Sequence, residues 1–119
     1  MSIRHAVAAV TACAALAAPA AAVAHTPIKS TSPKNRATVD RGLRAVEVVF
    51  RGSIPDGQLT VRTASGTKVS RGEARLVRGD RRLRARLKPG LKAGSYRATV
   101  RWLSPDGHVE SKTWSFRLR

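Results

Sequence analysis

The sequence has 119 residues, a formal net charge of +16, one cysteine, and two Trp, one Tyr and two Phe as its only aromatic residues besides His. A chain of this length has room for one domain with a modest core, and a single cysteine excludes a framework of intramolecular disulfides. The basic residues are spread along the chain with few aromatic side chains among them, which does not suit a nucleic-acid reader built on a basic stripe and stacking platforms. We expect a solvated basic exterior and no nucleic-acid partner, with binding of anionic lipid or polymer as the alternative.

Residues 1–24 have the composition of an export signal. Arg4 supplies the positive flank, residues 6–18 are small and apolar apart from one Thr, and Ala22-Val23-Ala24 fits the small-x-small rule for cleavage. Cleavage at that point would leave residues 25–119 as one mature domain. No second apolar run is long enough to cross a bilayer, so we expect a soluble protein of the periplasm.

The only cysteine, Cys13, lies inside this export segment. The stretch Val10-Thr11-Ala12-Cys13 resembles a lipoprotein cleavage box, although the apolar segment before it is short. Cleavage there would leave His25 internal, whereas cleavage after Ala24 would make it the first residue. In the second case the mature chain has no thiol, so its core or a ligand must hold the fold.

The first half of the mature chain is expected to be extended. Residues 25–39 contain two prolines and several Ser, Thr and Asn, which is typical of an arm with turns. Apolar residues then recur with a period of two, which predicts strands over residues 45–50 and 59–62. The turn residues Pro55-Asp56-Gly57 separate these strands, and residues 64–67 predict another turn.

The second half shows the same alternation more strongly. Residues 68–80 have few large apolar side chains and allow either a short strand or an irregular connection. Alternation of apolar with basic or polar residues predicts strands over 82–88, 96–102 and 114–118. About seven short strands without a helical pattern indicate an all-β fold, an immunoglobulin-like antiparallel β-sandwich of Greek-key type. The residues predicted to face the core are Val46, Val48, Phe50, Leu59, Val61, Leu83, Leu87, Tyr96, Val100, Trp102, Trp114, Phe116 and Leu118.

One tripeptide, Pro-Asp-Gly, occurs twice, at residues 55–57 and 105–107. Pro fixes φ and Gly accepts a positive φ, so both copies are interpreted as hairpin turns. Only the second copy is followed by a histidine, His108. Taken singly, Asp106 is a turn residue and His108 a surface histidine.

His25 changes this interpretation, because residues 25–119 contain only two histidines, His25 and His108. A histidine at a chain terminus can chelate a metal through its α-amine and its Nδ1. Together with Asp106 and His108 it offers three nitrogen donors and one oxygen donor, a set that suits Cu(II) in a tetragonal site. The sequence therefore predicts one Cu(II) per mature chain with His25, Asp106 and His108 as ligands.

Several stretches of the mature chain match a known pattern. They are His25 with Ser30-Thr31-Ser32-Pro33, then Leu91-Lys92-Ala93-Gly94-Ser95-Tyr96 leading into Trp102, then Ser104-Pro105-Asp106-Gly107-His108, and a closing strand with Phe116. From His25 to Arg119 the sequence thereby resembles the CopC family of bacterial copper-binding proteins. Lys112 and Trp114 depart from the pattern, because the family more often has Gly and Phe there.

The resemblance implies a small periplasmic β-sandwich that holds Cu(II) and acts in copper resistance or import, as a carrier or by sequestration. The family's ligands, an N-terminal His with its amine and the Asp and His of the turn, fall on His25, Asp106 and His108. The resemblance also implies an inner-membrane copper-transport partner of CopD type, and we expect a monomer. Some members carry a methionine-rich Cu(I) site, but the only methionine here is Met1, so a Cu(II)-only version is expected.

A copper oxygenase of the histidine-brace type is the alternative from another class. Such an enzyme would use His25 and His108 as its brace. Asp106 as a third equatorial ligand would fill the position where oxygen should bind, and so few aromatic residues offer little surface for a polysaccharide. We therefore expect no enzymatic activity.

Overall fold

The structure, a computed structural model, describes residues 25–119, which form eight strands. In chain order these are β1 (Ile28–Ser32), β2 (Thr38–Val39), β3 (Ala45–Phe50), β4 (Asp56–Thr63), β5 (Ser70–Val77), β6 (Arg82–Leu87), β7 (Gly94–Leu103) and β8 (Val109–Leu118). The predicted export signal, its cleavage point and Cys13 lie outside the described residues. Within residues 25–119 no helix is long and apolar enough to cross a membrane.

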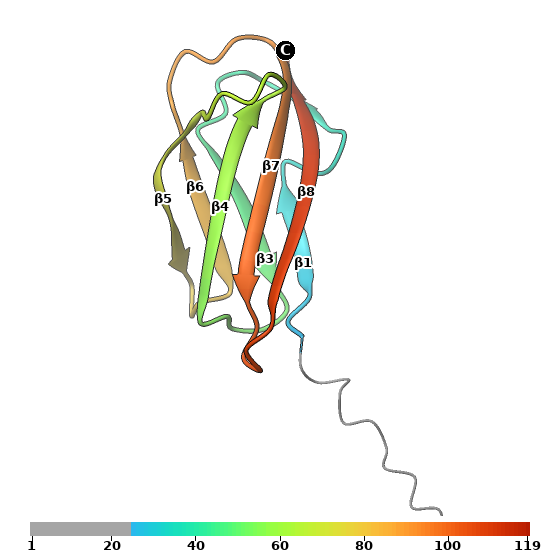
Figure 1. The fold of residues 1–119 in the computed structure, drawn as a ribbon. Helices are drawn as coiled ribbons and strands as arrows, with labels where there is room; N and C mark the ends of the chain where they lie inside the picture. The colour runs from blue at the N-terminus through green and yellow to red at the C-terminus, as the bar shows by residue number, and fades with distance from the viewer. Residues whose placement is uncertain (1–24) are drawn as a thin grey trace, which may run out of the picture.

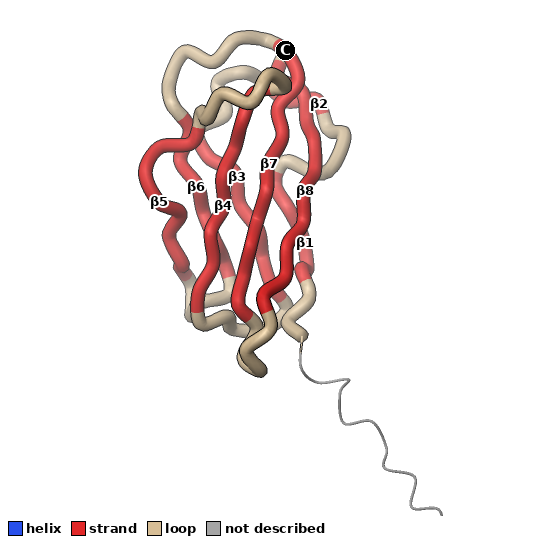
Figure 2. The backbone as a smooth tube through the Cα atoms, in the orientation of Figure 1, coloured by secondary structure: helices blue, strands red, loops and turns tan. Residues whose placement is uncertain are grey.

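Two four-stranded sheets pack face to face, with strand orders β1-β3-β6-β5 and β2-β8-β7-β4 (Figures 1 and 2). The pairings are antiparallel except for the short contact of β2 with β8, which is parallel. The predicted all-β sandwich is confirmed, and two-residue β2 accounts for the strand beyond the seven expected. β7 and β8 pair along their whole length, so the loop between them projects from one end of the sandwich.

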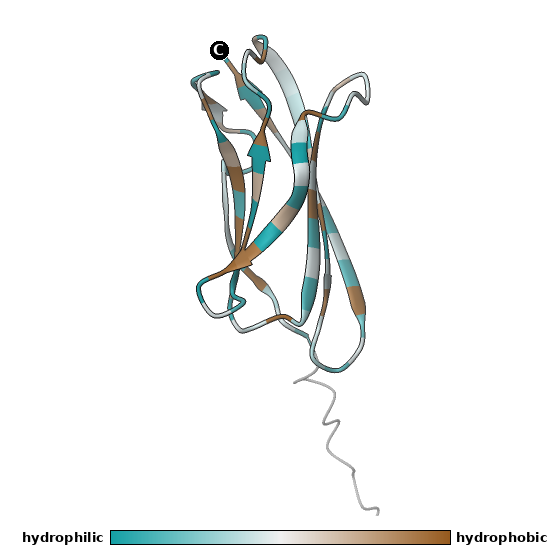
Figure 3. Ribbon diagram, turned by 90° about the vertical axis from the view of Figure 1, so that its left-hand side faces the viewer, coloured by the Kyte–Doolittle hydropathy of each residue, from teal (hydrophilic) through white to brown (hydrophobic). Residues whose placement is uncertain are grey.

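The core lies between the sheets because each strand buries alternate side chains. The burial pattern is regular in β3, where buried residues alternate with half-buried Ala45, Glu47 and Val49, and in β6, where they alternate with arginines. Figure 3 shows alternating hydropathy as bands along the strands. Every residue predicted to face inward is buried. The core also includes Ile54 and Val69, which lie in connections and so have no strand alternation to reveal them.

Both tryptophans fasten the N-terminal arm to this core. Trp102 Nε1 donates a hydrogen bond to the carbonyl of Thr26 (2.9 Å), and Trp114 Nε1 donates one to the carbonyl of Pro33 (2.9 Å). Both indoles are buried, and a buried indole N–H needs such a partner. The arm is thus held at Thr26 and at Pro33, and the bond to Thr26 fixes the position of the adjacent His25.

The prediction that both Pro-Asp-Gly copies are hairpin turns is wrong for residues 55–57. Asp56 and Gly57 are the first residues of β4 and pair with Leu103 and Trp102 of β7. The reason is that β3 and β4 belong to different sheets, so the chain between them crosses the sandwich and makes no hairpin.

Gly57 is needed there for close packing. A Cβ at this position would lie 3.1 Å from Ile54 Cδ1 and 3.1 Å from Leu83 Cδ2, both in the core. In the second copy the glycine has the other role, because Gly107 has a φ of 94° in a turn. The same tripeptide therefore serves packing at one position and turn geometry at the other.

The segment that the sequence left open, residues 68–80, contains β5. Its pairing with β6 is irregular, with a register shift between Arg71 and Arg75. Gly72 lies inside this bulge with a φ of 60°. A bulge explains why a plain alternation was not visible in this segment.

Candidate metal site

The predicted ligands come from two segments that meet at one end of the sandwich. His25 precedes the arm that leads into β1, while Asp106 and His108 lie in the loop between β7 and β8. In Figure 1 the start of the described chain lies beside this loop, at the lower end of the molecule. The centroids of the His25 and His108 rings are 5.3 Å apart, with an angle of 31° between the ring planes.

The loop is a tight turn closed by backbone hydrogen bonds. Gly107 N–H donates to the carbonyl of Ser104 (2.9 Å), and Ser104 N–H donates to the carbonyl of His108 (2.8 Å). Gly107 takes the left-handed conformation that a side chain would disfavour. The turn therefore fixes the backbone on both sides of Asp106.

The Asp106 carboxylate accepts hydrogen bonds from its own turn. Its Oδ1 accepts from the His108 N–H (3.1 Å), and its Oδ2 contacts His108 Nδ1. Loss of hydration works to raise the pKa of Asp106, but the two hydrogen bonds from His108 and the charges of His108 and His25 outweigh it, so the pKa is lowered. The carboxylate is thus kept ionised, as a metal ligand must be.

A buried serine joins the arm to the turn. Ser104 is 1% exposed, and its Oγ accepts a hydrogen bond from the Thr26 N–H (3.3 Å) and donates one to Glu110 Oε2 (3.1 Å). The carbonyl of Thr26 is held in turn by Trp102. His25, next to Thr26, is therefore placed beside the turn by a network that is largely buried.

Glu110 is the charged neighbour of this site that sequence reasoning missed. Its Oε1 lies 3.1 Å from His25 Nδ1, and its side chain is 29% exposed. It is the second residue of β8 and follows His108, the last residue of the loop, by two positions. That spacing was the available signal, but a surface glutamate in a strand is too common to stand out alone.

The structure brings His25, Asp106 and His108 together, but as two side-chain pairs, His25 with Glu110 and His108 with Asp106. Within residues 25–119, no group of three or more His, Cys, Asp or Glu side chains is placed so that it could hold one metal ion. Both imidazoles are accessible, with side-chain exposures of 51% for His25 and 66% for His108. The site therefore presents solvent-facing nitrogen and oxygen donors that are engaged with one another.

Comparison with known proteins gives one family match. The CopC domain pattern matches residues 28–119, a span that includes Asp106 and His108 and begins just after His25. No curated protein sequence matches the chain.

Two solved structures are similar in fold. CopC from Methylosinus trichosporium OB3b has 24% sequence identity and a TM-score of 0.66, covering 79% of this chain and 93% of its own. PcoC from Escherichia coli, described as a methionine-rich copper resistance protein, has 20% identity and a TM-score of 0.65, covering 81% of this chain and 100% of its own. Because both sequence identities are below 25%, the similarity establishes the shared sandwich fold alone.

Proposed function

Because the chain belongs to the CopC family, we propose that it binds one Cu(II) ion at the end of the sandwich where His25, Asp106 and His108 meet. The observation that carries this proposal is the 5.3 Å separation of the two imidazole rings beside an ionised carboxylate. These rings belong to the only two histidines in residues 25–119. Imidazole nitrogen and carboxylate oxygen are donors that suit Cu(II).

The fourth donor in this proposal is the α-amine that cleavage after Ala24 creates on His25. Copper would then take Nδ1 of His25 and the new amine together, so the Nδ1 contact with Glu110 must be exchanged for a bond to the metal. The contact between His108 and Asp106 is exchanged in the same way. Glu110 in this scheme is a positioning residue, which holds His25 toward the turn before copper arrives.

The proposed role is that of a periplasmic copper carrier or copper-sequestering protein, without enzymatic activity. Solvent-facing ligands on one end of a rigid sandwich favour transfer of the ion to another protein, because a partner can approach both histidines directly. An inner-membrane transport protein of CopD type is the partner we propose. A copper oxygenase is disfavoured because Asp106 would occupy the position that oxygen needs.

Intact mass spectrometry of the exported protein, with and without Cu(II), tests the proposal. The expected result is a chain that begins at His25 and gains the mass of one copper ion. A chain that begins at Cys13, or one that gains no copper, would contradict it.

The role of the terminus is tested by a form that retains one residue before His25. The ring nitrogen remains in this form, but the amine becomes an amide, so Cu(II) affinity measured by competition should weaken severely while the fold persists. His108→Ala should act similarly and Asp106→Asn more mildly. Asp56→Asn is the matched control, since it makes the same change in the other Pro-Asp-Gly copy and should leave affinity unchanged. Equal affinity of the authentic and extended forms would show that the amine is not a ligand.

A further inference from the structure

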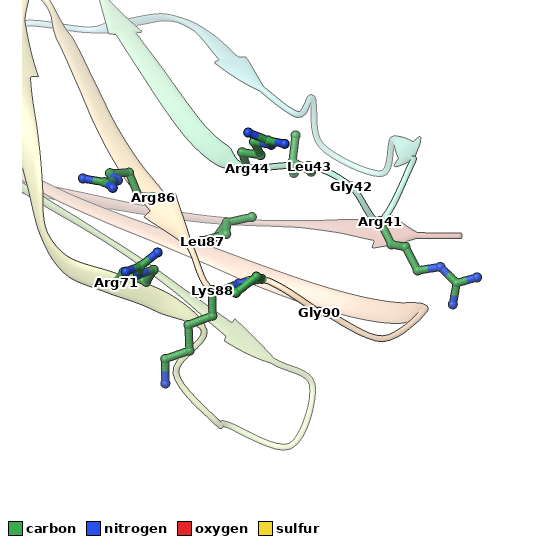
Figure 4. A pocket seen from close by; sticks show the side chains of 10 residues that line it. Arg41, Gly42, Leu43, Arg44, Arg71, Arg86, Leu87, Lys88 and Gly90 are labelled. Carbon is green, nitrogen blue, oxygen red and sulfur yellow. The ribbon is translucent and has the colours of Figure 1, made fainter.

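A second charged site lies at the other end of the sandwich. A pocket of about 420 Å³ is lined by the loop before β3, the start of β5, and the end of β6 with the turn that follows. Its charged lining residues, here called the arginine pocket, are Arg41, Arg44, Arg71, Arg86 and Lys88 (Figure 4). These residues are far apart in the sequence, so the fold gathers charge that looked dispersed along the chain.

The lining of the arginine pocket includes no acidic residue. Across residues 25–119, none of its five cations lies within ion-pair distance of a carboxylate, whereas Arg82 and Arg84 both pair with Glu47. Asp40 is adjacent in sequence, but its Oδ1 accepts a hydrogen bond from the Gly42 N–H (2.7 Å). Glu73 lines a neighbouring hollow that shares Arg71 and Arg86, and it too makes no ion pair within the described chain. The cations of the pocket are therefore without an ion-pair partner among residues 25–119.

Two of the arginines are forced to face each other. Arg71 of β5 and Arg86 of β6 are direct antiparallel partners, so their side chains leave the sheet on the same side. Like charges directly opposite each other destabilise a sheet. In Figure 4 Arg71 and Arg86 lie on the same side of the pocket, while Arg41 and Lys88 extend away from this pair.

The backbone that carries the pocket residues is tied to its neighbours by hydrogen bonds. Leu87 N–H donates to the carbonyl of Arg44 (2.9 Å), and Lys88 N–H donates to the carbonyl of Val69 (2.9 Å). Leu87 is buried and forms part of the pocket lining. These hydrogen bonds hold the backbone of the pocket in place, so a bound anion would reduce the repulsion between the arginines without moving the strands.

We propose that the arginine pocket binds a multiply charged phosphate-bearing anion. Guanidinium groups present forked donors that match phosphate oxygens in pairs, and they do so better than point charges. The volume of about 420 Å³ exceeds what one phosphate needs and falls in the range of small-molecule sites. A free oligophosphate and the phosphate headgroups of an anionic membrane share this chemistry.

The arginine pocket is independent of the metal site. It lies where β6 ends and β7 begins, whereas His108 lies where β7 ends and β8 begins. A protein held at a membrane surface by the arginine pocket would keep its histidines directed away from that surface.

The test uses the exported protein in copper-free buffer with inorganic pyrophosphate as the probe, followed by calorimetry and by backbone amide chemical shifts. Wild-type protein should bind, with shifts centred on Arg44, Arg71 and Leu87. The double variant Arg71→Gln/Arg86→Gln should weaken binding by about tenfold or more. Arg62→Gln/Arg97→Gln is the matched control, because these arginines are also direct strand partners but lie outside the pocket. The control should bind within about twofold of wild type.

A vesicle arm separates the two sources of phosphate. Sedimentation with phosphatidylcholine vesicles, with and without phosphatidylglycerol, is measured for wild type and both double variants. Pocket-dependent binding of pyrophosphate alone identifies a free anion as the ligand, and pocket-dependent binding of the phosphatidylglycerol vesicles identifies a membrane. Equal losses in the two double variants, or no binding in either arm, would overturn the proposal, because the charge would then act only as a diffuse surface.

Discussion

Ser104 connects the arm that carries His25 to the turn that carries His108, through hydrogen bonds with Thr26 and Glu110. Replacing Ser104 by Ala leaves the buried Thr26 N–H without a partner, which should cost about 1–3 kcal/mol of unfolding free energy. Cu(II) affinity should fall by about fivefold, because His25 is less well placed. Denaturant unfolding and copper competition measure the two effects. Ser111→Ala, an exposed change in β8, should alter neither quantity. If Ser104→Ala also leaves the stability and the Cu(II) affinity unchanged, the hydrogen bonds of Ser104 are not needed to position the arm.

Because the pKa of Asp106 is lowered, the pH dependence of copper binding can distinguish the oxygen donor from the nitrogen donors. A carboxyl whose pKa is lowered on folding adds stability above its unfolded pKa and loses it as pH falls through the folded value. Between about pH 8 and pH 5 Asp106 therefore stays ionised, so a loss of affinity in this range comes from protons that compete with copper for the nitrogen donors. Cu(II) affinity should fall steadily over this range in the wild type, and Asp106→Asn should show the same slope from a weaker starting value. Flat affinity in competition titrations would contradict a nitrogen-based site.

The candidate ligands could be predicted from the sequence, but the contact that His25 makes with Glu110 could not. His25, Asp106 and His108 stood out by residue type and by position relative to the cleavage point and the turn. Glu110 did not, because its contact with His25 depends on how the arm is laid across the sandwich, a relation between residues 85 positions apart. Local patterns do not contain that information.

At the scale of elements, Gly57 marks the place where the chain crosses from one sheet to the other. A Cβ there would press on Ile54 and Leu83, which are fully buried and have little room to move. Gly57→Ala should therefore lower the unfolding free energy by about 1–3 kcal/mol. Gly52→Ala is the control, because its Cβ would meet Thr26 Cγ2 at an ordinary 3.7 Å. Thermal unfolding compares the two variants. A Gly57→Ala protein as stable as the control would show that Ile54 and Leu83 can shift to accommodate the added methyl group.

The strands were predictable because alternation is a local signal, and each alternating segment became a strand with the expected inward face. The role of the first Pro-Asp-Gly was not, because a turn tripeptide does not say whether the strands on its two sides share a sheet. The bulge of β5 was hidden for a related reason, since an irregular register breaks the alternation by which a strand is recognised.

At the scale of the whole molecule, residues 25–119 contain no Met and no Cys. Soft sulfur ligands favour Cu(I), so reduced copper should prefer ligands that residues 25–119 do not offer. Adding ascorbate and a Cu(I) chelator to the copper-loaded protein should release the metal, as measured by the absorbance of the chelator complex. Retention of all the copper would reveal a Cu(I) site outside the proposed ligands.

The bond from the Trp102 indole to Thr26 also gives the protein a built-in optical probe. The residue that this indole binds, Thr26, is adjacent to the proposed ligand His25, whereas Trp114 binds the arm at Pro33, beyond β1. Cu(II) is paramagnetic and quenches nearby indole emission, so one equivalent should remove the Trp102 part of the fluorescence and leave the Trp114 part. Zn(II), which has a filled d shell, should not quench at the same site. The arm that positions the ligand thus also makes each binding event visible as a change in emitted light, without any added label.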